Sequence, residues 1–369
     1  MAGIYIHLPY CHAKCAYCDF YSTPDTSTMA QLPAAIAREW QARSAELDGE
    51  RVDTIYFGGG TPSMLQPAML DSLLEILPAE EASEITIEVN PEDVSEEFAR
   101  WLAHSLFNRV SMGIQSLDDD ELKAVGRRHT ARQAIEAVRR LRDAGIMNLS
   151  LDLIFGLPGQ TLESWERSLR GVLDLRPTHL SAYSLMVEPG TRIYARMNTG
   201  KLTLPSQQLN AEMYRRLCTV SAGYGMEHYE ISNFALPGHR SKHNSAYWNL
   251  TPYLGLGPSA HSFTQGVRSY NSKSVKDYIA NPLTRTVEHL NTNEHIDEYL
   301  LIRLRTLEGL DTKEFRKLFG AKETEQLLKR AAADIRSSRL EASDNYLRIP
   351  RQHWLVSDPI IIGLMCDQS

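Results

Sequence analysis

The sequence has few cysteines, no long apolar run and no excess of positive charge, and each of these absences excludes a class of protein. Five cysteines among 369 residues are too few for a disulfide framework, and Cys218 and Cys366 lie far apart. No apolar run approaches the roughly 20 residues of a membrane-spanning helix. The net charge of −7 gives no general attraction for nucleic acid, so we expect no nucleic-acid partner.

The start of the chain has no recognisable targeting pattern. Met1-Ala2-Gly3 leads directly into a predicted strand, without the charged and apolar regions of a signal peptide. Together with the few, separated cysteines, this predicts a cytoplasmic protein in a reducing compartment. The length suits one large domain of roughly 200–250 residues and a smaller one.

The other three cysteines are grouped in a single short segment. Cys11, Cys15 and Cys18 have the spacing C-x3-C-x2-C. Three thiolates are one short of a four-coordinate structural zinc site, but they can hold a four-iron ([4Fe–4S]) cluster and leave one iron open for chemistry. A zinc knuckle or a redox-active thiol group is the alternative, and it needs a fourth ligand, for which His7 and His12 are the only local candidates.

The first half of the sequence alternates β-rich runs with amphipathic helical stretches, as expected for a parallel sheet wound by helices. The predicted strands are Gly3–Leu8, Thr54–Phe57, Glu84–Val89, Arg109–Ile114, Asn148–Phe155 and His179–Met186. The predicted helices are Met29–Leu47, Pro67–Leu77, Ser95–His104, Ala131–Ala144 and Thr161–Leu173. Six βα units are too few for a closed eight-stranded barrel, and the periodicity alone also allows a doubly wound sheet.

Polar residues and glycines follow successive predicted strands. These segments are Gly58-Gly59-Gly60-Thr61-Pro62, Glu88-Val89-Asn90-Pro91, Gln115-Ser116 and, within and after the fifth strand, Asp152 to Gly159. In βα architectures the site forms at the carboxyl ends of the strands. Each segment alone also has an ordinary explanation as a tight turn, a surface acid or a cap. Their occurrence together behind a three-cysteine loop favours a binding site.

The cysteine spacing, with Tyr17 just before Cys18, resembles the signature of the radical S-adenosylmethionine (SAM) superfamily. The resemblance implies a partial (β/α)6 barrel. It also implies that Cys11, Cys15 and Cys18 hold the [4Fe–4S] cluster, and that the amino acid end of SAM chelates the free iron. The reduced cluster then cleaves SAM to a 5′-deoxyadenosyl radical.

Within this superfamily the sequence is similar to the oxygen-independent coproporphyrinogen III dehydrogenase group. The matching motifs are Tyr5-Ile6-His7, Tyr56 to Pro62, Glu88 to Pro91, Gly113 to Ser116, Gly126 to His129 and Asp152 to Thr161. The resemblance implies that SAM is contacted by Tyr5, Tyr17, Gly59, Gly60, Thr61, Glu88, Gln115, Arg127 and Asp152. These residue types suit the ligand, because Arg127 can pair with the carboxylate of SAM and the other polar groups with its amine and ribose.

Three features resemble a sister family, the HemW-type haem chaperones, more than the dehydrogenase. Asp19-Phe20 follows the last cysteine of the loop, where the dehydrogenase has a further cysteine two positions on. The dehydrogenase has a further segment ahead of the cluster loop, whereas here the first predicted strand begins at Gly3. His243-Asn244-Ser245-Ala246-Tyr247-Trp248 reproduces the H-N-x-x-Y-W motif of the chaperones.

The H-N-x-x-Y-W motif implies contacts with haem. Imidazole is a common axial ligand of haem iron, so His243 is the expected ligand, and Tyr247 and Trp248 offer flat apolar faces to a porphyrin. The alternative is an aromatic loop that anchors two domains, with His243 hydrogen-bonded to backbone.

The last third of the sequence changes character. The glycine-rich stretch from Tyr253 to Ser262 is expected to pass near the barrel mouth, and it lacks the lysine and following helix of a phosphate-binding loop. Helices predicted at Ile296–Leu307, Thr312–Leu318 and Glu323–Arg339, and a hairpin at Leu340–Pro350 around Asp344-Asn345, look like a winged-helix module. Its basic residues are interleaved with acidic ones, which argues against DNA binding. The expected domains are residues 1–235, a connecting region 236–290 and 291–369.

The sequence therefore predicts a haem chaperone on a radical SAM scaffold, with an [4Fe–4S] cluster, SAM and haem as its ligands. The expected partners are acceptor haem proteins, including respiratory ones. The alternative is an oxygen-independent coproporphyrinogen III oxidase that forms protoporphyrinogen IX. The sequence leaves open whether SAM is turned over, whether partners bring the protein to a membrane, and whether it forms a homodimer, and it identifies no catalytic residue.

Overall fold

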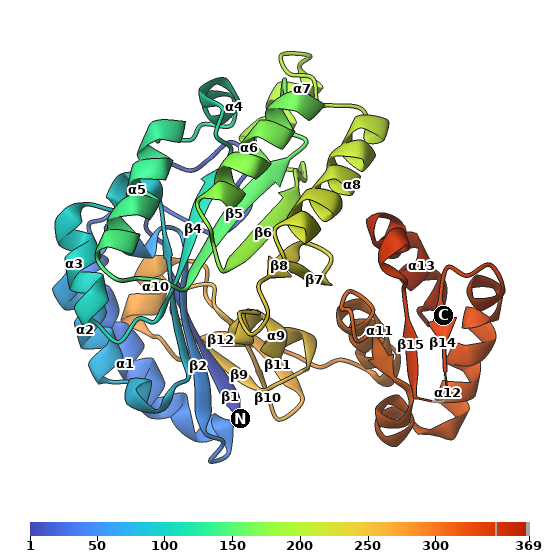
Figure 1. Cartoon of the computed structure of the whole chain (residues 1–369). Coiled ribbons are helices and arrows are strands. Elements are labelled where there is room, and N and C mark those ends of the chain that lie inside the picture. The colour runs from blue at the N-terminus through green and yellow to red at the C-terminus, as the bar shows by residue number, and fades with distance from the viewer. Residues whose placement is uncertain (344, 367–369) are drawn as a thin grey trace.

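A sheet of twelve strands forms the centre of the larger part of the molecule (Figure 1). The computed structural model describes residues 1–343 and 345–366. Six strands lie side by side in chain order and all run parallel: β1 (Ala2–Leu8), β2 (Val52–Gly59), β3 (Glu84–Val89), β4 (Arg109–Gln115), β5 (Leu149–Phe155) and β6 (His179–Ser184). These strands confirm the predicted mixed α/β class and the partial barrel.

Helices follow these strands and cover the outside of the sheet (Figure 1). They are α1 (Leu32–Arg43), α2 (Pro67–Glu75), α3 (Glu96–His104), α4 (Asp119–Ala124), α5 (Ala131–Asp143) and α6 (Leu162–Asp174). All except α4 were predicted. Side chains fix where several of them begin, because the Thr130 and Thr161 hydroxyls each accept from a backbone N–H three residues on.

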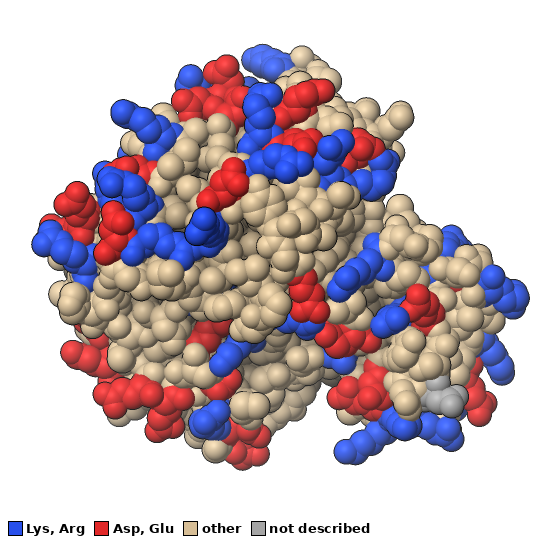
Figure 2. Space-filling view, viewed as in Figure 1, with Lys and Arg blue, Asp and Glu red and all other residues tan. Residues whose placement is uncertain are grey.

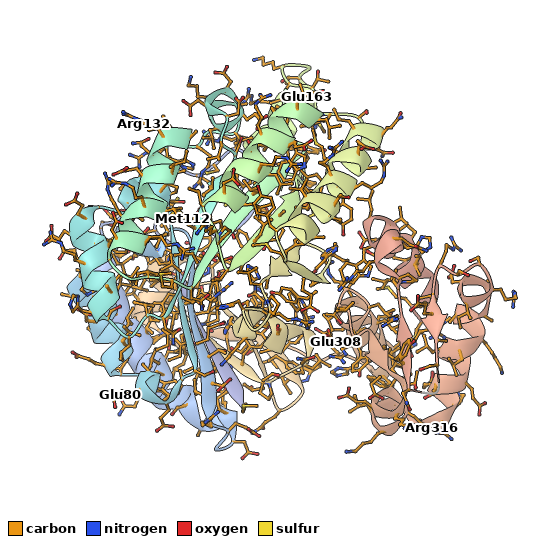
Figure 3. All side chains as sticks on the ribbon, viewed as in Figure 1. Glu80, Met112, Arg132, Glu163, Glu308 and Arg316 are labelled. Atoms are coloured by element: carbon orange, nitrogen blue, oxygen red, sulfur yellow. The ribbon has the colours of Figure 1, made fainter. Side chains whose placement is uncertain are left out.

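The parallel strands have an apolar outer face and a polar inner face. On β1, for example, Ile4, Ile6 and Leu8 are fully buried in the core, whereas Tyr5 and His7 project from the opposite face. Met112 of β4 is likewise fully buried in the core, while Arg132 and Glu163 point from the outer helices into solvent (Figure 3). The polar inner face therefore lines the lumen of the partial barrel.

The sheet extends beyond the parallel strands on both sides, which the sequence did not predict. Beyond β6 lie the antiparallel strands β8 (Asn233–Ala235) and β7 (Glu227–Glu230). On the other side β9 (Tyr253–Leu256) pairs parallel with β1, and β10 (His261–Thr264), β11 (Val267–Asn271) and β12 (Arg285–Glu288) follow antiparallel.

The helices between β6 and the C-terminal part of the chain were not predicted either. They are α7 (Arg192–Asn198), α8 (Gln207–Gly223), α9 (Lys242–Trp248) and α10 (Val275–Ala280). Residues 236–290, expected to be a connecting region, thus supply four strands of the main sheet. The glycine-rich turn after β9 does reach the carboxyl end of β1, since a Cβ atom on Gly257 would lie 2.4 Å from the carbonyl oxygen of His7. The domain boundaries themselves stay a prediction.

A smaller helical unit forms the C-terminal part (Figure 1). It contains α11 (Thr292–Arg303), α12 (Thr312–Arg336), a 3-10 helix (Arg351–Val356) and α13 (Ser357–Leu364). The short strands β13 (Leu310–Asp311), β15 (Tyr346–Arg348) and β14 (Glu341–Ala342) form its sheet. Two helices were predicted where α12 runs, and the chain does break there, at Gly320 with φ of 91°. The predicted hairpin is present, but Asp344 at its turn lies outside the described residues.

The surface agrees with the interleaved charges of the sequence. Figure 2 shows lysine and arginine mixed with aspartate and glutamate over the face in view. In the part of the chain that the structure describes, no helix combines the length and hydropathy needed to cross a bilayer.

Candidate functional site

The cysteine loop is held in place at the carboxyl end of β1. The backbone N–H of Cys11 donates to the Thr23 carbonyl over 3.0 Å, and the N–H of Thr23 donates back to Pro9 over 2.8 Å. Further along the loop, the N–H of Ala16 donates to Val125 over 2.9 Å. Backbone hydrogen bonds therefore fix both halves of the loop against the barrel.

All three thiols of this loop are free, with that of Cys11 buried and those of Cys15 and Cys18 half-buried. Within the described residues, no three Cys, His, Asp or Glu side chains converge as ligands of a single metal ion. In a four-iron cluster each cysteine binds a different iron, so its ligands do not meet at one point. The assignment of Cys11, Cys15 and Cys18 to a cluster stays a prediction.

Arg127 connects the cysteine loop to the ends of the neighbouring strands. Its Nη1 atom donates to the sulfur of Cys15 over 3.6 Å, and its Nη2 donates to Asn90 Oδ1 over 2.8 Å and to the Gly113 carbonyl over 2.6 Å. Burial opposes the positive charge, but Tyr17 and Cys15 outweigh it and raise the pKa of Arg127. This guanidinium therefore stays charged beside the loop.

A small pocket opens beside Arg127. It is lined by His12, Ala13, Cys15, Thr61, Asn90, Glu92, Gly126, Arg127 and Arg128. One buried polar atom of its lining residues, Nε of Arg127, has no hydrogen-bond partner, whereas Oε2 of Glu92 lies 3.5 Å from Nδ1 of His129. An unpaired buried polar atom is costly, so the free Nε of Arg127 fits a polar ligand that completes the site.

Two carboxyl groups face the lumen close to this end of the barrel. Glu88 accepts from the Tyr56 hydroxyl over 2.8 Å and from the N–H of Gly59 over 3.2 Å. Burial, reinforced by the nearby Asp152, raises the pKa of Glu88 to about 7. Burial likewise raises the pKa of Asp152 to about 6, although the Ser111 hydroxyl donates to it over 3.4 Å. Such a pair favours binding of a cation, whose charge would ionise both groups.

The glycine run at the end of β2 allows close packing against the cysteine loop. Gly59 has φ of 112°, and a Cβ atom on Gly60 would lie 2.5 Å from the Tyr10 carbonyl oxygen. The next residue, Thr61, accepts from Asn90 Nδ2 over 3.0 Å. These residues join the strand ends to the loop, and their contact with SAM stays a prediction.

The remaining residues predicted to contact SAM also lie at this end. Tyr17 is half-buried, and its pKa is raised by burial, which the charge of Arg127 partly offsets. The Tyr5 hydroxyl lies 3.1 Å from His7 Nδ1, and His7 Nε2 lies 3.0 Å from the Tyr21 carbonyl of the cysteine loop. Gln115 has φ of 68° where β4 leaves its register with β5, a conformation that is costly for a residue other than glycine.

The residues predicted to contact haem lie at the opposite end of the barrel. His243, on α9, is 1% exposed, with Nδ1 2.8 Å from Thr54 Oγ1 and Nε2 2.9 Å from the Tyr247 hydroxyl. Thr54 is near the beginning of β2, so α9 covers the amino ends of the strands. Because both ring nitrogens are hydrogen-bonded, this geometry does not favour His243 as an iron ligand.

The alternative explanation of the H-N-x-x-Y-W motif, an aromatic segment that anchors two domains, agrees better with the structure. It differs in one respect, because the ring of His243 is hydrogen-bonded to side chains and not to backbone. Trp248 packs edge-on against Tyr229 at 5.8 Å between ring centroids, and its carbonyl accepts from Arg303 of α11 over 3.4 Å. Glu308 lies at the same junction between the two parts (Figure 3) and pairs with Arg240 at 2.7 Å. The motif thus joins the barrel to the C-terminal unit.

The sequence did not single out all residues of the site. Asn90 and Glu92 line the pocket beside Arg127; Asn90 belongs to a segment that the sequence placed after a strand without giving this residue a role, and Glu92 lies just beyond that segment. Ser111, Ser150 and Ser181 surround Asp152. An alternation of polar and apolar residues along β4, β5 and β6 indicates an inward-facing polar side, but it does not identify the carboxylate.

This open barrel, with a three-cysteine loop after β1 and polar strand ends around it, defines the radical SAM class, and residues 5–171 match the model of the radical SAM superfamily. The heme chaperone HemW of Bacillus subtilis (strain 168) is 38% identical over 332 residues, 87% of each chain. The heme chaperone HemW of Lactococcus lactis is 38% identical over 323 residues, 85% of this chain and 84% of the relative. The chain therefore belongs to the HemW heme chaperone family.

A solved structure supports the fold over the whole chain. The coproporphyrinogen III oxidase HemN from Escherichia coli, described as a radical SAM enzyme, has a TM-score of 0.83 and 24% sequence identity. The match covers 99% of this chain and 90% of that one. At this identity the likeness shows a shared fold and does not transfer the activity.

Proposed function

We propose that this protein binds an [4Fe–4S] cluster, SAM and haem, and transfers the haem to acceptor haem proteins in the cytoplasm, respiratory ones included. The observation that carries the proposal is the 38% identity to heme chaperones over 87% of the chain. Haem is the cargo, and the cluster and SAM assist or regulate its delivery.

The donor set of the cysteine loop fits the cluster. Cys11, Cys15 and Cys18 supply three thiolates, and Arg127 places a positive charge 3.6 Å from the sulfur of Cys15. Cysteine binds iron as the thiolate, and the guanidinium of Arg127 donates toward this sulfur. The cluster, when bound, supplies the electron that cleaves SAM.

The strand ends fit SAM. In this proposal the Arg127 guanidinium pairs with the carboxylate of SAM, and Glu88 and Asp152 receive its positively charged amine and ribose hydroxyls. Tyr5, Tyr17, Gly59, Gly60, Thr61 and Gln115 complete the site. The unpaired Nε of Arg127, a residue that lines the pocket, supports a polar ligand at this place.

Haem binding is proposed for the protein without His243 as its iron ligand. Tyr247 and Trp248 are half-buried, and aromatic rings of this kind can contact a porphyrin. Whether they do so stays a prediction.

An anaerobic assay of the purified, cluster-reconstituted protein tests the proposal. Titration with haem should give a saturable change in the optical spectrum at about one haem per chain. Incubation with coproporphyrinogen III, SAM and a reductant should give no protoporphyrinogen IX. Absence of haem binding, or sustained formation of protoporphyrinogen IX, would contradict the chaperone function and favour the oxidase.

A further inference from the structure

Aromatic rings form a continuous column along the lumen of the barrel. The ring of His243 stacks on that of Tyr56 with centroids 5.0 Å apart and planes 23° apart. Tyr56 stacks on Tyr5 at 6.1 Å and 26°, Tyr5 lies 6.0 Å from His7, and His7 lies 6.4 Å from Tyr21. The column therefore runs from α9, at the amino ends of the strands, to Tyr21 in the cysteine loop.

The base of this column is rigidly held. The ring nitrogens of His243 are paired with Thr54 at 2.8 Å and Tyr247 at 2.9 Å, and its backbone N–H donates to Glu84 Oε1 over 2.9 Å. The backbone of β1 closes the site on a further side, because a Cβ atom on Gly3 would lie 3.1 Å from Thr54 Oγ1 and in ordinary contact, at 3.4 Å, with His243 Cε1. Contacts on three sides thus fix the position of the imidazole.

The second ring of the column reaches the candidate SAM site. The Tyr56 hydroxyl donates to Glu88 Oε1 over 2.8 Å, and the other oxygen of Glu88 accepts from Gly59. Tyr56 is half-buried, and its ring stacks on His243 at 5.0 Å and on Tyr5 at 6.1 Å between centroids. The stack on His243 is the closer of the two, so it is one of the restraints on where the Tyr56 hydroxyl points.

We propose that His243 is a positioning residue of the SAM site, whose ring holds Tyr56, and through Tyr56 the carboxylate of Glu88, in the arrangement that receives SAM. The inference rests on the SAM site of the proposed function. It gives the H-N-x-x-Y-W motif a role at the base of the barrel that differs from ligation of haem iron. It also gives a reason for a polar side chain at a place that is 1% exposed.

The first comparison sets three variants and one control variant of the reconstituted, full-length protein against the unsubstituted one. His243→Ala removes the stacked ring, and Tyr56→Phe removes only the hydroxyl that reaches Glu88. SAM affinity, measured by anaerobic calorimetry, should fall about tenfold in each, as for one lost hydrogen bond to a charged group. Because both act on the same contact, the double variant should lose little more than either. His239→Ala, at an exposed histidine on the same connection, is the matched control.

A second comparison separates positioning from haem ligation. His243→Phe keeps a ring against Tyr56 but cannot bind iron, so it should restore part of the SAM affinity that His243→Ala loses. The haem spectrum and the iron content should be the same in all variants. A merely structural role would lower thermal stability and leave SAM affinity unchanged.

SAM affinity within about twofold of the unsubstituted protein in both His243→Ala and Tyr56→Phe would overturn the inference alone. An altered haem spectrum with unchanged SAM affinity would overturn it in favour of iron ligation. If the unsubstituted protein binds no SAM, the proposed SAM site fails and the inference fails with it. If His243→Ala does not fold, Tyr56→Phe, which removes a single hydroxyl, decides the question.

Discussion

The guanidinium of Arg127 lies against the thiol of Cys15, with 3.6 Å between Nη1 and the sulfur. The same side chain is fixed by Asn90, after β3, and by the carbonyl of Gly113 in β4. One residue therefore joins the cysteine loop to the strand ends where SAM is expected. A change at Arg127 is expected to affect SAM binding more than folding, because only this end of the barrel depends on it.

Replacing Arg127 by Gln should weaken SAM binding by about 1.5–3 kcal/mol, the range for a hydrogen bond to a charged group. Arg127→Lys should recover only part of this loss, because an ammonium keeps the charge but not the planar fork that pairs with a carboxylate. Calorimetry on the reconstituted proteins measures the effect. Equal SAM affinity in all three proteins would exclude Arg127 from the site.

Replacing any one of Cys11, Cys15 and Cys18 by Ala should abolish a stable [4Fe–4S] cluster, because no fourth thiolate lies in the loop to substitute. Cys218→Ala and Cys366→Ala are the controls and should keep the cluster. Burial raises the pKa of Cys218 to about 11, so it is a poor source of thiolate. Iron and sulfide analysis with electron paramagnetic resonance of the reduced protein decides. Full cluster occupancy in Cys15→Ala would refute the assignment.

The parts of the molecule that could be predicted from sequence are those fixed by local patterns. The cysteine loop is a contiguous motif, and residues such as Glu88 and Arg127 follow strands whose parallel order brings their carboxyl ends together. The pairing of β9 with β1 was not predicted, because Tyr253 meets Gly3 only through tertiary structure. The hydrogen-bond partner of His243 could not be predicted from sequence either, because Thr54 lies 189 residues earlier. A histidine next to aromatic residues is typical of both an iron ligand and a buried hydrogen-bonded side chain.

The raised pKa of Glu88, about 7 against an ordinary 4.5, predicts two opposite pH dependences. A carboxyl whose pKa is raised by folding stabilises the folded state below its ordinary pKa, and this contribution is lost as pH rises through about 7. Without SAM, the protein should therefore be less stable at pH 8 than at pH 6. SAM affinity should instead increase over this interval, because Glu88 must ionise to receive the amine.

Glu88→Gln is the control for both effects. It keeps a hydrogen-bonding group of similar size but cannot ionise, so the fall in thermal stability between pH 6 and pH 8 should become smaller. Its SAM affinity should be low and should lose the part of the pH dependence that comes from Glu88. Asp152, whose pKa is raised to about 6, contributes with the same sign at slightly lower pH. SAM affinity that falls with rising pH in the unsubstituted protein would contradict this role of Glu88.

Asp152→Ala should weaken SAM binding by about 1–3 kcal/mol, the cost of one buried ligand hydrogen bond, and leave iron and sulfide content unchanged. Asp143→Ala, at an exposed aspartate at the end of α5, is the matched control and should change neither quantity. Calorimetry and metal analysis on the same preparations provide both readouts. Unchanged SAM affinity in both Asp152→Ala and Glu88→Ala would reject the proposed SAM site.

Haem transfer is the most direct test of the proposed function. The reconstituted protein, loaded with one equivalent of labelled haem and freed of excess, is mixed anaerobically with the apo form of a b-type cytochrome, with and without SAM. We predict that labelled haem moves to the cytochrome faster than it does from serum albumin loaded to the same extent, and that the acceptor gains its characteristic absorption bands. Haem that stays on the protein, or that moves no faster than from albumin, would contradict the chaperone function.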